Sequence, residues 1–279
     1  MLVVVKPSAA VSTQRHVDWV KKQIQCKKMT CDWFFTMGNF INDVKNIRQL
    51  SQGQDVVVVI GGDGTLHLVI NGIVGLTCRF ALLPAGTGND FARQFGYSLS
   101  QWRQSIFSTK YSAIDVGKVN SRYFVNMMGV GFSAKVVRSI KSQSKRNKLS
   151  YVWAGLLNLV SYQSVKVASS LGHPTPMMMM LIANGRYFAA GLPCAPSADA
   201  QSGTLTCLEF HADSLITRLM TFLLMLFAQH ERLSIVHKIE SQQFSIDAVG
   251  LDIEADGEII GETPAHVSCF PKAVEICIL

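Results

Sequence analysis

Two glycine-rich segments, each directly after an apolar run, contain residue types that bind phosphate. The first is Gly61–Thr65 (G-G-D-G-T), which follows four valines and an isoleucine. The second is Pro84–Arg93 (P-A-G-T-G-N-D-F-A-R). Glycine lets a phosphate approach the backbone, and the first amides of a helix attract anions. We therefore expect two phosphate-binding loops. In the first, Thr65 would cap the following helix and Asp63 would hold a metal ion. Either segment could also be an ordinary strand–helix turn.

A third segment, Asp256-Gly257-Glu258, places two carboxylates one residue apart. Asp-Gly is a favoured two-residue hairpin turn, so the segment has a purely structural interpretation. The functional interpretation is that the carboxylates act as a general base on a hydroxyl group or contact a metal ion. The residues alone leave both interpretations open.

The first hundred residues alternate short apolar runs with helical patterns, which predicts a parallel sheet flanked by helices. The expected strands are residues 2–5, 29–35, 55–60 and 80–83, with helices near 17–24, 40–50 and 65–73. Both glycine-rich loops then follow strands of one sheet and lie at its carboxyl edge, where such folds bind ligands. Two phosphate-type loops at one edge are harder to explain as ordinary turns than one.

After residue 115 the pattern changes to short strands, which predicts an antiparallel β-sandwich. The expected strands are residues 123–128, 165–169, 177–183, 204–210, 233–239, 244–248, 251–255 and 273–279, with helices near 133–160 and 214–229. The fold class is therefore α/β plus all-β. We place the first domain at residues 1–115 and the second at residues 116–279.

The net charge of +7 is unevenly distributed along the 279 residues. Residues 1–115 carry 12 basic and 7 acidic side chains, residues 116–198 carry 10 and none, and residues 199–279 carry 4 and 12. The balances are +5, +10 and −8, which sum to +7. A stretch without carboxylates suggests an anionic partner such as phosphates, a membrane surface or nucleic acid. No nucleic-acid-binding module accompanies it, so we expect no nucleic-acid partner.

Membrane contact is expected to be peripheral. The longest apolar run, residues 219–228, is shorter than the roughly 18 residues that a bilayer requires. One basic run could bind anionic headgroups or form a solvated helix face: Arg138, Lys141, Lys145, Arg146 and Lys148. The apolar residues that follow could insert at an interface or pack in the core: Trp153, Leu156, Leu157, Leu159 and Val160. Seven cysteines without a C-x-x-C pair and an N-terminus without a basic leader predict a cytoplasmic protein.

Together, Gly61–Thr65, Leu83–Arg93 and Asp256–Pro264 (D-G-E-I-I-G-E-T-P) resemble the diacylglycerol kinase catalytic-domain superfamily. The resemblance is greatest to its soluble bacterial lipid kinases, which are related to sphingosine and ceramide kinases. Lesser matches are Thr36, the segment 124–132, and Asn184-Gly185 with Gly191 and Pro196. The resemblance covers nearly the whole chain. It implies a lipid kinase that uses ATP and Mg²⁺, with diacylglycerol as the leading substrate and a role in phospholipid biosynthesis.

The resemblance also implies roles for the two domains and for individual residues. The first domain would bind the nucleotide, the second would help to hold the lipid, and catalysis would occur in the cleft between them. Glu258, with Asp256 beside it, would take the proton from the lipid hydroxyl. The implied metal ligands are Asp63, Asp199, Ser202 and Thr204. The implied nucleotide contacts are Lys6, Ser8, Thr36, Gly61, Gly62, Asp63, Gly64, Thr65, Gly86, Thr87, Gly88 and Asn89.

Three positions depart from the family pattern. The first phosphate loop is Lys6–Ala10 without the family's Asn and Gly, Leu68 replaces a glutamate, and Ser202-Gly203 replaces an Asp-Gly pair of an auxiliary Mg²⁺ site. These departures motivate a second hypothesis, a nucleotide- and lipid-binding protein with weakened catalysis. NAD kinase is the enzymatic alternative, because it shares G-G-D-G-T and a similar two-domain plan. The lipid's identity and the oligomeric state, with a homodimer as one option, stay open.

Overall fold

A computed structural model describes residues 1–7, 11–141, 158–160, 162–169 and 172–279. The chain divides into two compact units. The first consists of Met1–Ile114 and Lys272–Leu279, and the second of Asp115–Pro271. Two strands, β5 (Tyr111–Val119) and β16 (Ala265–Cys277), contribute residues to both units.

The first unit contains a parallel sheet with strand order β2-β1-β3-β4-β16. Every pair that forms it is parallel, as the alternation of apolar runs and helical patterns predicted. Its other strands are β1 (Leu2–Val5), β2 (Asp32–Phe35), β3 (Val56–Gly61) and β4 (Arg79–Pro84). Its helices are α1 (Val11–Lys27), α2 (Phe40–Ser51), α3 (Asp63–Ile73), α4 (Asp90–Arg93) and α5 (Leu99–Ser105).

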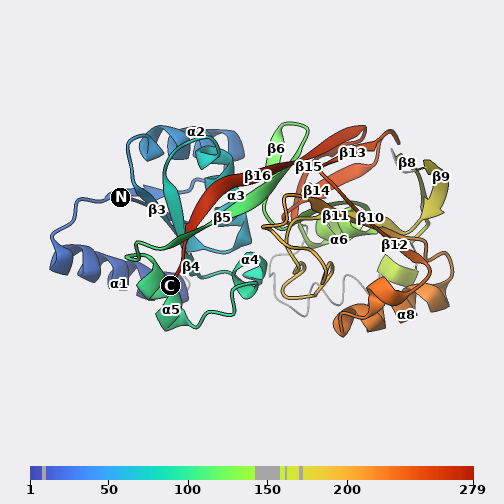
Figure 1. Ribbon diagram of the computed structural model, residues 1–279, viewed down its shortest axis with the longest axis horizontal. Coiled ribbons are helices and arrows are strands. Elements are labelled where there is room, and N and C mark those ends of the chain that lie inside the picture. The colour runs from blue at the N-terminus through green and yellow to red at the C-terminus, as the bar shows by residue number, and fades with distance from the viewer. Residues whose placement is uncertain (8–10, 142–157, 161, 170–171) are drawn as a thin grey trace. The chain divides into compact units, whose positions relative to one another are not determined.

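Helices cover both faces of this sheet, which explains why β1 and most of β3 are fully buried apolar runs. On one face α2 packs against α3, where Gly72 leaves room for Ile47: a Cβ at Gly72 would lie 2.6 Å from the Ile47 Cγ2. On the other face the rings of Trp19 in α1 and Phe107 after α5 are 6.2 Å apart. Figure 1 shows the two helix pairs on opposite sides of the sheet.

The second unit contains a six-stranded sheet in which every pair is antiparallel, with the order β12-β11-β10-β7-β14-β15. Its strands are β7 (Met127–Gly131), β10 (Met179–Ala183), β11 (Leu205–Phe210), β12 (Val236–Ser241), β14 (Asp252–Ala255) and β15 (Glu258–Glu262). The remaining strands are β6 (Arg122–Phe124), β8 (Val165–Ser169), β9 (Gly172–Met177) and β13 (Gln243–Ile246), which pair with β5, β16 or each other.

Two apolar clusters hold the second unit together. One brings side chains of the six-stranded sheet, such as Val130 and Ile182, against Phe244 and Val267 of β13 and β16. The other packs the opposite face of that sheet under α6 (Phe132–Lys141) and α8 (Leu215–Leu226). A layered antiparallel domain was predicted, and the structure confirms it.

Several boundaries differ from those expected. Residues 272–279, predicted in the second domain, pack in the first unit, because Ile276 pairs in parallel with Phe80 and the Ile278 amide donates to the Lys110 carbonyl at 3.1 Å. The predicted strand 177–183 is interrupted at Met178, whose amide donates to the Phe210 carbonyl at 2.7 Å. Residues 123–128 likewise divide into β6 and β7.

Among the described residues, no helix is long and apolar enough to cross a bilayer. Part of the predicted membrane-facing run cannot be placed: Lys145, Arg146, Lys148, Trp153, Leu156 and Leu157 lie outside the described residues, as does Ser8. Arg138 is described and forms an ion pair with Asp252.

Candidate active site

The carboxyl ends of four parallel strands meet at one edge of the first unit. The register pairs Val5 with both Phe35 and Ile60, and it pairs Gly61 with Pro84. The residues that follow these strands, among them Lys6, Thr36, Gly62 and Ala85, therefore lie along the same edge. This is the edge at which the sequence placed the phosphate-binding residues.

The two glycine-rich loops touch through their backbones. A Cβ added to Gly86 would lie 2.4 Å from the Gly62 Cα, and one added to Gly62 would lie 2.8 Å from the Gly86 Cα. The Ala85 amide also donates to the Gly61 carbonyl at 2.8 Å. Only glycine allows so close an approach, so Gly62 and Gly86 let the two loops contact each other through their backbones.

Thr65 does not cap the helix as expected. Helix α3 begins at Asp63, with Gly62 as its N-cap and no side-chain cap. Thr65 is instead buried in the first turn, where its hydroxyl would lie 2.2 Å from a Cβ at Gly61. The helix starts earlier because the glycine bend brings the Gly62 carbonyl into range of the Leu66 amide at 3.1 Å.

The side chains of Asn89 and Asp63 stabilise the two loops by hydrogen bonds to backbone groups. Asn89 is left-handed (φ 51°), accepts from the Gly86 amide at 2.8 Å and donates to the Gly86 carbonyl at 2.9 Å. Asp63 accepts from the Phe91 amide at 3.0 Å and so ties the start of α3 to α4. Thr87 is exposed at the tip of the second loop. Carboxylate oxygens suit Mg²⁺, and Asp63 offers such oxygens at this edge, although one already accepts a hydrogen bond.

A buried carboxylate that the sequence did not predict, Asp43, stabilises the turn after β2 at the same edge. Asp43 in α2 is fully buried and accepts from the amides of Met37 and Gly38 at 2.9 and 3.0 Å. It thereby fixes the turn directly after the buried Thr36. Lys6 is exposed, and its amide donates to the Ile60 carbonyl at 3.3 Å.

In the second unit, Asp256 and Gly257 form the two-residue turn between β14 and β15. Both have positive φ, 48° and 83°, and Ala255 pairs with Glu258 across the turn. The Asp256 carboxylate faces inward and accepts from the amides of residues 125, 126 and 127 at 3.0, 2.9 and 3.3 Å. The segment is therefore a hairpin turn, as the structural interpretation held, and Asp256 holds its neighbours in place.

Asn184 also hydrogen-bonds to residues 125 and 126, through carbonyl oxygens. Its side-chain amide donates to the carbonyls of Asp115 and Val125, both at 2.9 Å, and its backbone amide donates to the Asn126 carbonyl at 2.8 Å. Asn184 is fully buried. Asp256 and Asn184 together give Glu258 a rigid support.

The two glutamates next to the turn, Glu258 and Glu254, lie in different surroundings. Glu258 is half-buried beside Arg122: burial lowers the pKa of the Arg122 guanidinium, and the Glu258 charge counteracts this. Glu254 is fully buried, and desolvation raises its pKa well above the usual value. Its carboxyl group accepts from the Gly257 amide at 3.3 Å. The other carboxyl oxygen faces Gly129, where an added Cβ would lie 2.9 Å from it and 2.3 Å from the Ser133 hydroxyl. Neither Arg122 nor Glu254 carries a sequence signal, because their roles depend on pairing between distant strands.

An apolar pocket opens in the second unit, with Ser133 as one of its few polar members. Its empty space is about 650 Å³, which includes open solvent at its mouth. The walls come from α6, β10, α8 and the segment 188–194, and the lining residues include Phe132, Val137, Met179, Leu181, Phe188, Phe222 and Met225. Ser133 and the Glu254 carboxyl group flank the same glycine, Gly129, so the pocket lies near the carboxyl group that accepts from the Gly257 amide of the turn.

The auxiliary metal site does not fit the residues present. The Ser202 hydroxyl donates to the Asp199 carbonyl at 2.9 Å and lies 3.1 Å from both the carbonyl and the hydroxyl oxygen of Thr204. The Asp199 carboxylate accepts from the Gln201 amide at 3.1 Å. The hydroxyl thus occupies the position among these oxygens that a cation would need, and hydrogen bonds close the turn instead.

Comparisons with known proteins divide the chain close to residue 120, and the second match includes residues 272–278, which pack in the first unit. A family model described as the diacylglycerol kinase catalytic domain matches residues 1–119. A second, described as the YegS C-terminal NAD kinase beta sandwich-like domain, matches residues 126–278.

Relatives cover nearly the full length. Proteins of Staphylococcus aureus strains JH9 and N315, provisionally named as lipid kinases, are 24% identical over 90% of this chain and 87% of theirs. The crystal structure of a diacylglycerol kinase from Bacillus anthracis strain Sterne superposes with a TM-score of 0.77 at 18% identity, covering all of this chain and 96% of the other.

Proposed function

Because the chain belongs to the diacylglycerol kinase catalytic-domain superfamily, we propose that it is an ATP-dependent lipid kinase with diacylglycerol as its first candidate substrate. The observation that carries the proposal is an arrangement in the second unit: Ser133 of the apolar pocket and the buried Glu254 both flank Gly129, and Glu254 accepts from the Gly257 amide of the Asp256–Glu258 turn. This arrangement supports an apolar lipid-binding pocket in the same unit as Glu258, the proposed base.

The glycine-rich edge of the first unit supports the nucleotide role. Gly62 and Gly86 leave two backbones without side chains at the carboxyl ends of β3 and β4, and α3 directs its first amides to the same edge. The exposed Lys6 adds positive charge there. These groups would hold the phosphates, and Thr36 would contact the nucleotide.

In the proposed reaction, Glu258 takes the proton from the lipid hydroxyl. The hydroxyl oxygen forms a bond to the γ-phosphorus, the bond from that phosphorus to the bridging oxygen breaks, and ADP leaves with the electron pair. Phosphoryl transfer depends chiefly on positioning and on charge stabilisation. Asp256 supplies the positioning, because its three amide contacts fix the turn that carries Glu258.

Magnesium would neutralise charge on the phosphates, with Asp63 as the residue that fits it best. Asp63 is also a structural residue through its bond to the Phe91 amide, so its replacement should disturb the loop as well as the metal. The hydrogen-bonded turn at Ser202 does not contribute a metal ligand in this proposal.

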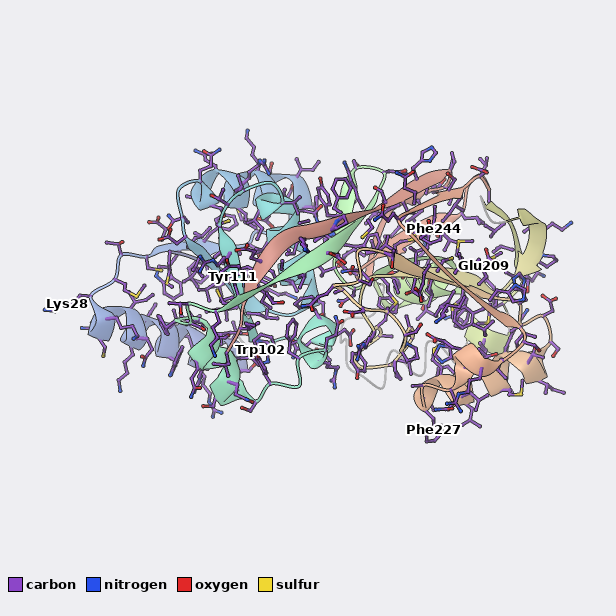
Figure 2. The ribbon with its side chains drawn as sticks, viewed as in Figure 1. Lys28, Trp102, Tyr111, Glu209, Phe227 and Phe244 are labelled. Carbon is purple, nitrogen blue, oxygen red and sulfur yellow. The ribbon has the colours of Figure 1, made fainter. Side chains whose placement is uncertain are left out.

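Helix α8 supports contact with a lipid bilayer. One side of the helix contributes Thr221, Phe222 and Met225 to the pocket. The other side exposes large apolar side chains, including Ile216 (79% exposed), Leu223 (56%) and Phe227 at its end (66%); Figure 2 labels Phe227 on the outer side of this helix. A helix between a lipid pocket and solvent, with apolar residues on both sides, is suited to lie against a membrane.

A kinase assay tests the function. Purified protein would be incubated with labelled ATP, Mg²⁺ and a panel of lipids that includes diacylglycerol, with NAD offered separately. We expect label in a lipid phosphate. Label on NAD alone would overturn the proposal, and binding of ATP and lipid without turnover on any lipid would favour the weakened-catalysis hypothesis.

Vesicle sedimentation tests the membrane contact. Replacing Ile216 and Leu223 by Ser should weaken binding to phosphatidylcholine–phosphatidylglycerol vesicles about tenfold or more, because burying each side chain contributes roughly 1.5–3 kcal/mol. Val249→Ser is the matched control, since Val249 is 82% exposed elsewhere in the second unit. Equal loss in the control and the double variant would contradict a specific role for α8.

A further inference from the structure

Three side chains at one end of the six-stranded sheet have the chemistry of a transition-metal site: Glu209, His211 and His237. One ligand atom of each lies within 4.8 Å of the others. Within the part of the chain that the structure describes, this is the group of His, Cys, Asp and Glu residues that meets metal-site spacing. Figure 2 labels Glu209 in this region of the second unit.

The topology places all three on one face of the sheet. Glu209 and His237 are direct partners in the antiparallel register of β11 and β12. His211 follows Glu209 by two residues, and its amide continues the ladder by donating to the Ile235 carbonyl at 2.8 Å. Residues two apart in a strand, and residues directly opposite in antiparallel strands, share a face.

The hydrogen bond of His211 determines which ring nitrogen is available. Its Nδ1 lies 3.1 Å from the Pro176 carbonyl oxygen, which can only accept, so Nδ1 carries the hydrogen. Metal-binding histidines commonly donate their second nitrogen to a carbonyl in this way. The other nitrogen, Nε2, is buried, has no hydrogen-bond partner and lies 3.5 Å from the Glu209 Oε2.

This juxtaposition favours a bound cation. In the neutral ring, Nε2 presents a lone pair to a carboxylate oxygen, and two acceptors at that distance repel. A proton on either atom, or a metal ion between the two atoms, removes the repulsion. Zinc bonds of about 2.0–2.2 Å put two tetrahedral ligand atoms roughly 3.3–3.5 Å apart, which matches the observed separation.

We propose that Glu209, His211 and His237 form a binding site for a divalent transition metal such as Zn²⁺. His237 is exposed, so a change of its rotamer can bring it to bonding distance, and water would complete the coordination. Imidazole ligands favour Zn²⁺ over Mg²⁺, so the site is distinct from any magnesium used by the kinase reaction. The metal would link β11 to β12, at the opposite edge of the sheet from the hairpin of Glu258.

Cobalt titration of the full-length, untagged protein tests the site, because Co²⁺ replaces Zn²⁺ and absorbs visible light. We expect one Co²⁺ per chain with tetrahedral absorption bands, displaced by Zn²⁺ and unaffected by Mg²⁺. His211→Gln and His237→Gln should each weaken binding at least about tenfold. His266→Gln is the matched control, because His266 is an exposed histidine that contacts Ser245 on a different strand pair. It should bind as the wild type does.

Thermal unfolding supplies the second measurement. Zn²⁺ should raise the melting temperature of the wild type and of His266→Gln, and leave that of His211→Gln unchanged. Melting curves without metal identify any variant that fails to fold. If His211→Gln fails to fold, His237→Gln still tests the site, because His237 is exposed. Wild-type affinity in both ligand variants, thiolate charge-transfer absorption, or no Co²⁺ binding at all would overturn the proposal.

Discussion

The proposed kinase machinery has two halves, the glycine-rich edge in the first unit and the Asp256–Glu258 turn in the second unit, and they are built from different kinds of groups. At the edge of the first unit, the critical atoms belong to the backbone, and Gly62 and Gly86 matter because they have no side chain. In the turn of the second unit, the critical atoms are carboxylates, of which Asp256 and Glu254 are buried. The first half offers neutral backbone amides at a helix N-terminus, whereas the second half keeps ionisable side chains away from water. Substitutions should therefore harm the two halves in different ways.

The largest expected effect is on proton transfer. Glu258→Gln removes the proposed base but keeps its shape, so turnover should fall roughly 10²–10⁴-fold while ATP binding persists. Glu262→Gln, on the exposed end of the same hairpin, is the control. Initial rates with labelled ATP and isothermal titration with ATP measure the two properties. Turnover within a few-fold of the wild type would show that the second half does not supply the base.

Asp256→Asn tests whether the turn is held by charge. The substitution replaces one oxygen by an amide group that would face a backbone N–H, and it weakens the remaining bonds among those to residues 125–127. Loss of hydrogen bonds to a buried charge should cost about 1.5–3 kcal/mol in the free energy of unfolding. Urea denaturation measures it.

Asp252→Asn is the comparison for this variant. Asp252 is in the same strand region, but its ion pair with Arg138 involves a guanidinium side chain that is 62% exposed, so the loss should not exceed about 1 kcal/mol. If both variants lose the same amount, the inward orientation of Asp256 is not what stabilises the turn.

Gly86→Ala tests the backbone half. The new Cβ would lie 2.4 Å from the Gly62 Cα, so the two loops must separate, and overpacking of this kind costs about 1–3 kcal/mol. We expect weaker ATP binding and lower stability, measured by titration and urea denaturation.

Gly64→Ala is the stability control for the loop. Its Cβ would point into open space in the first turn of α3, so the free energy of unfolding should stay equal or rise by up to about 1 kcal/mol. If Gly86→Ala and Gly64→Ala lower the free energy of unfolding equally, the close approach of the two loops is not the reason for glycine at position 86.

The same contrast explains what the sequence could predict. The glycine-rich loops are local: Gly61–Thr65 follows a recognisable strand, and the parallel arrangement brings it to Gly86. The hairpin turn at Asp256 was also local. The orientation of the Asp256 carboxylate was not, because its partners are about 130 residues away in sequence. The walls of the apolar pocket are scattered for the same reason.

Errors in the predicted elements also arose where distant pairing decided the outcome. Residues 272–277 form the end of the 13-residue strand β16, whose last part pairs with β4, a choice that strand propensity cannot reveal. The burial of Glu254 is a similar case. Its neighbour Gly129 is a glycine because a Cβ there would lie 2.3 Å from the Ser133 hydroxyl and 2.9 Å from the Glu254 carboxyl group.

Glu254 gives an effect that depends on pH. Burial raises its pKa well above the usual value of 4.5, so the folded protein binds a proton that the unfolded chain releases as the pH rises. The contribution of this group is fully present below pH 4.5 and is lost as the pH increases toward the folded-state pKa, by at most about 1.4 kcal/mol per pH unit. Glu254→Gln cannot ionise, so its stability should decline less over this range and exceed that of the wild type at the alkaline end. Urea denaturation from pH 4 to 8 measures the difference, with Glu262→Gln as the exposed control. A parallel pH dependence in wild type and Glu254→Gln would mean that water reaches the carboxyl group, and the contrast between a backbone-built half and a buried-carboxyl half would then fail at Glu254.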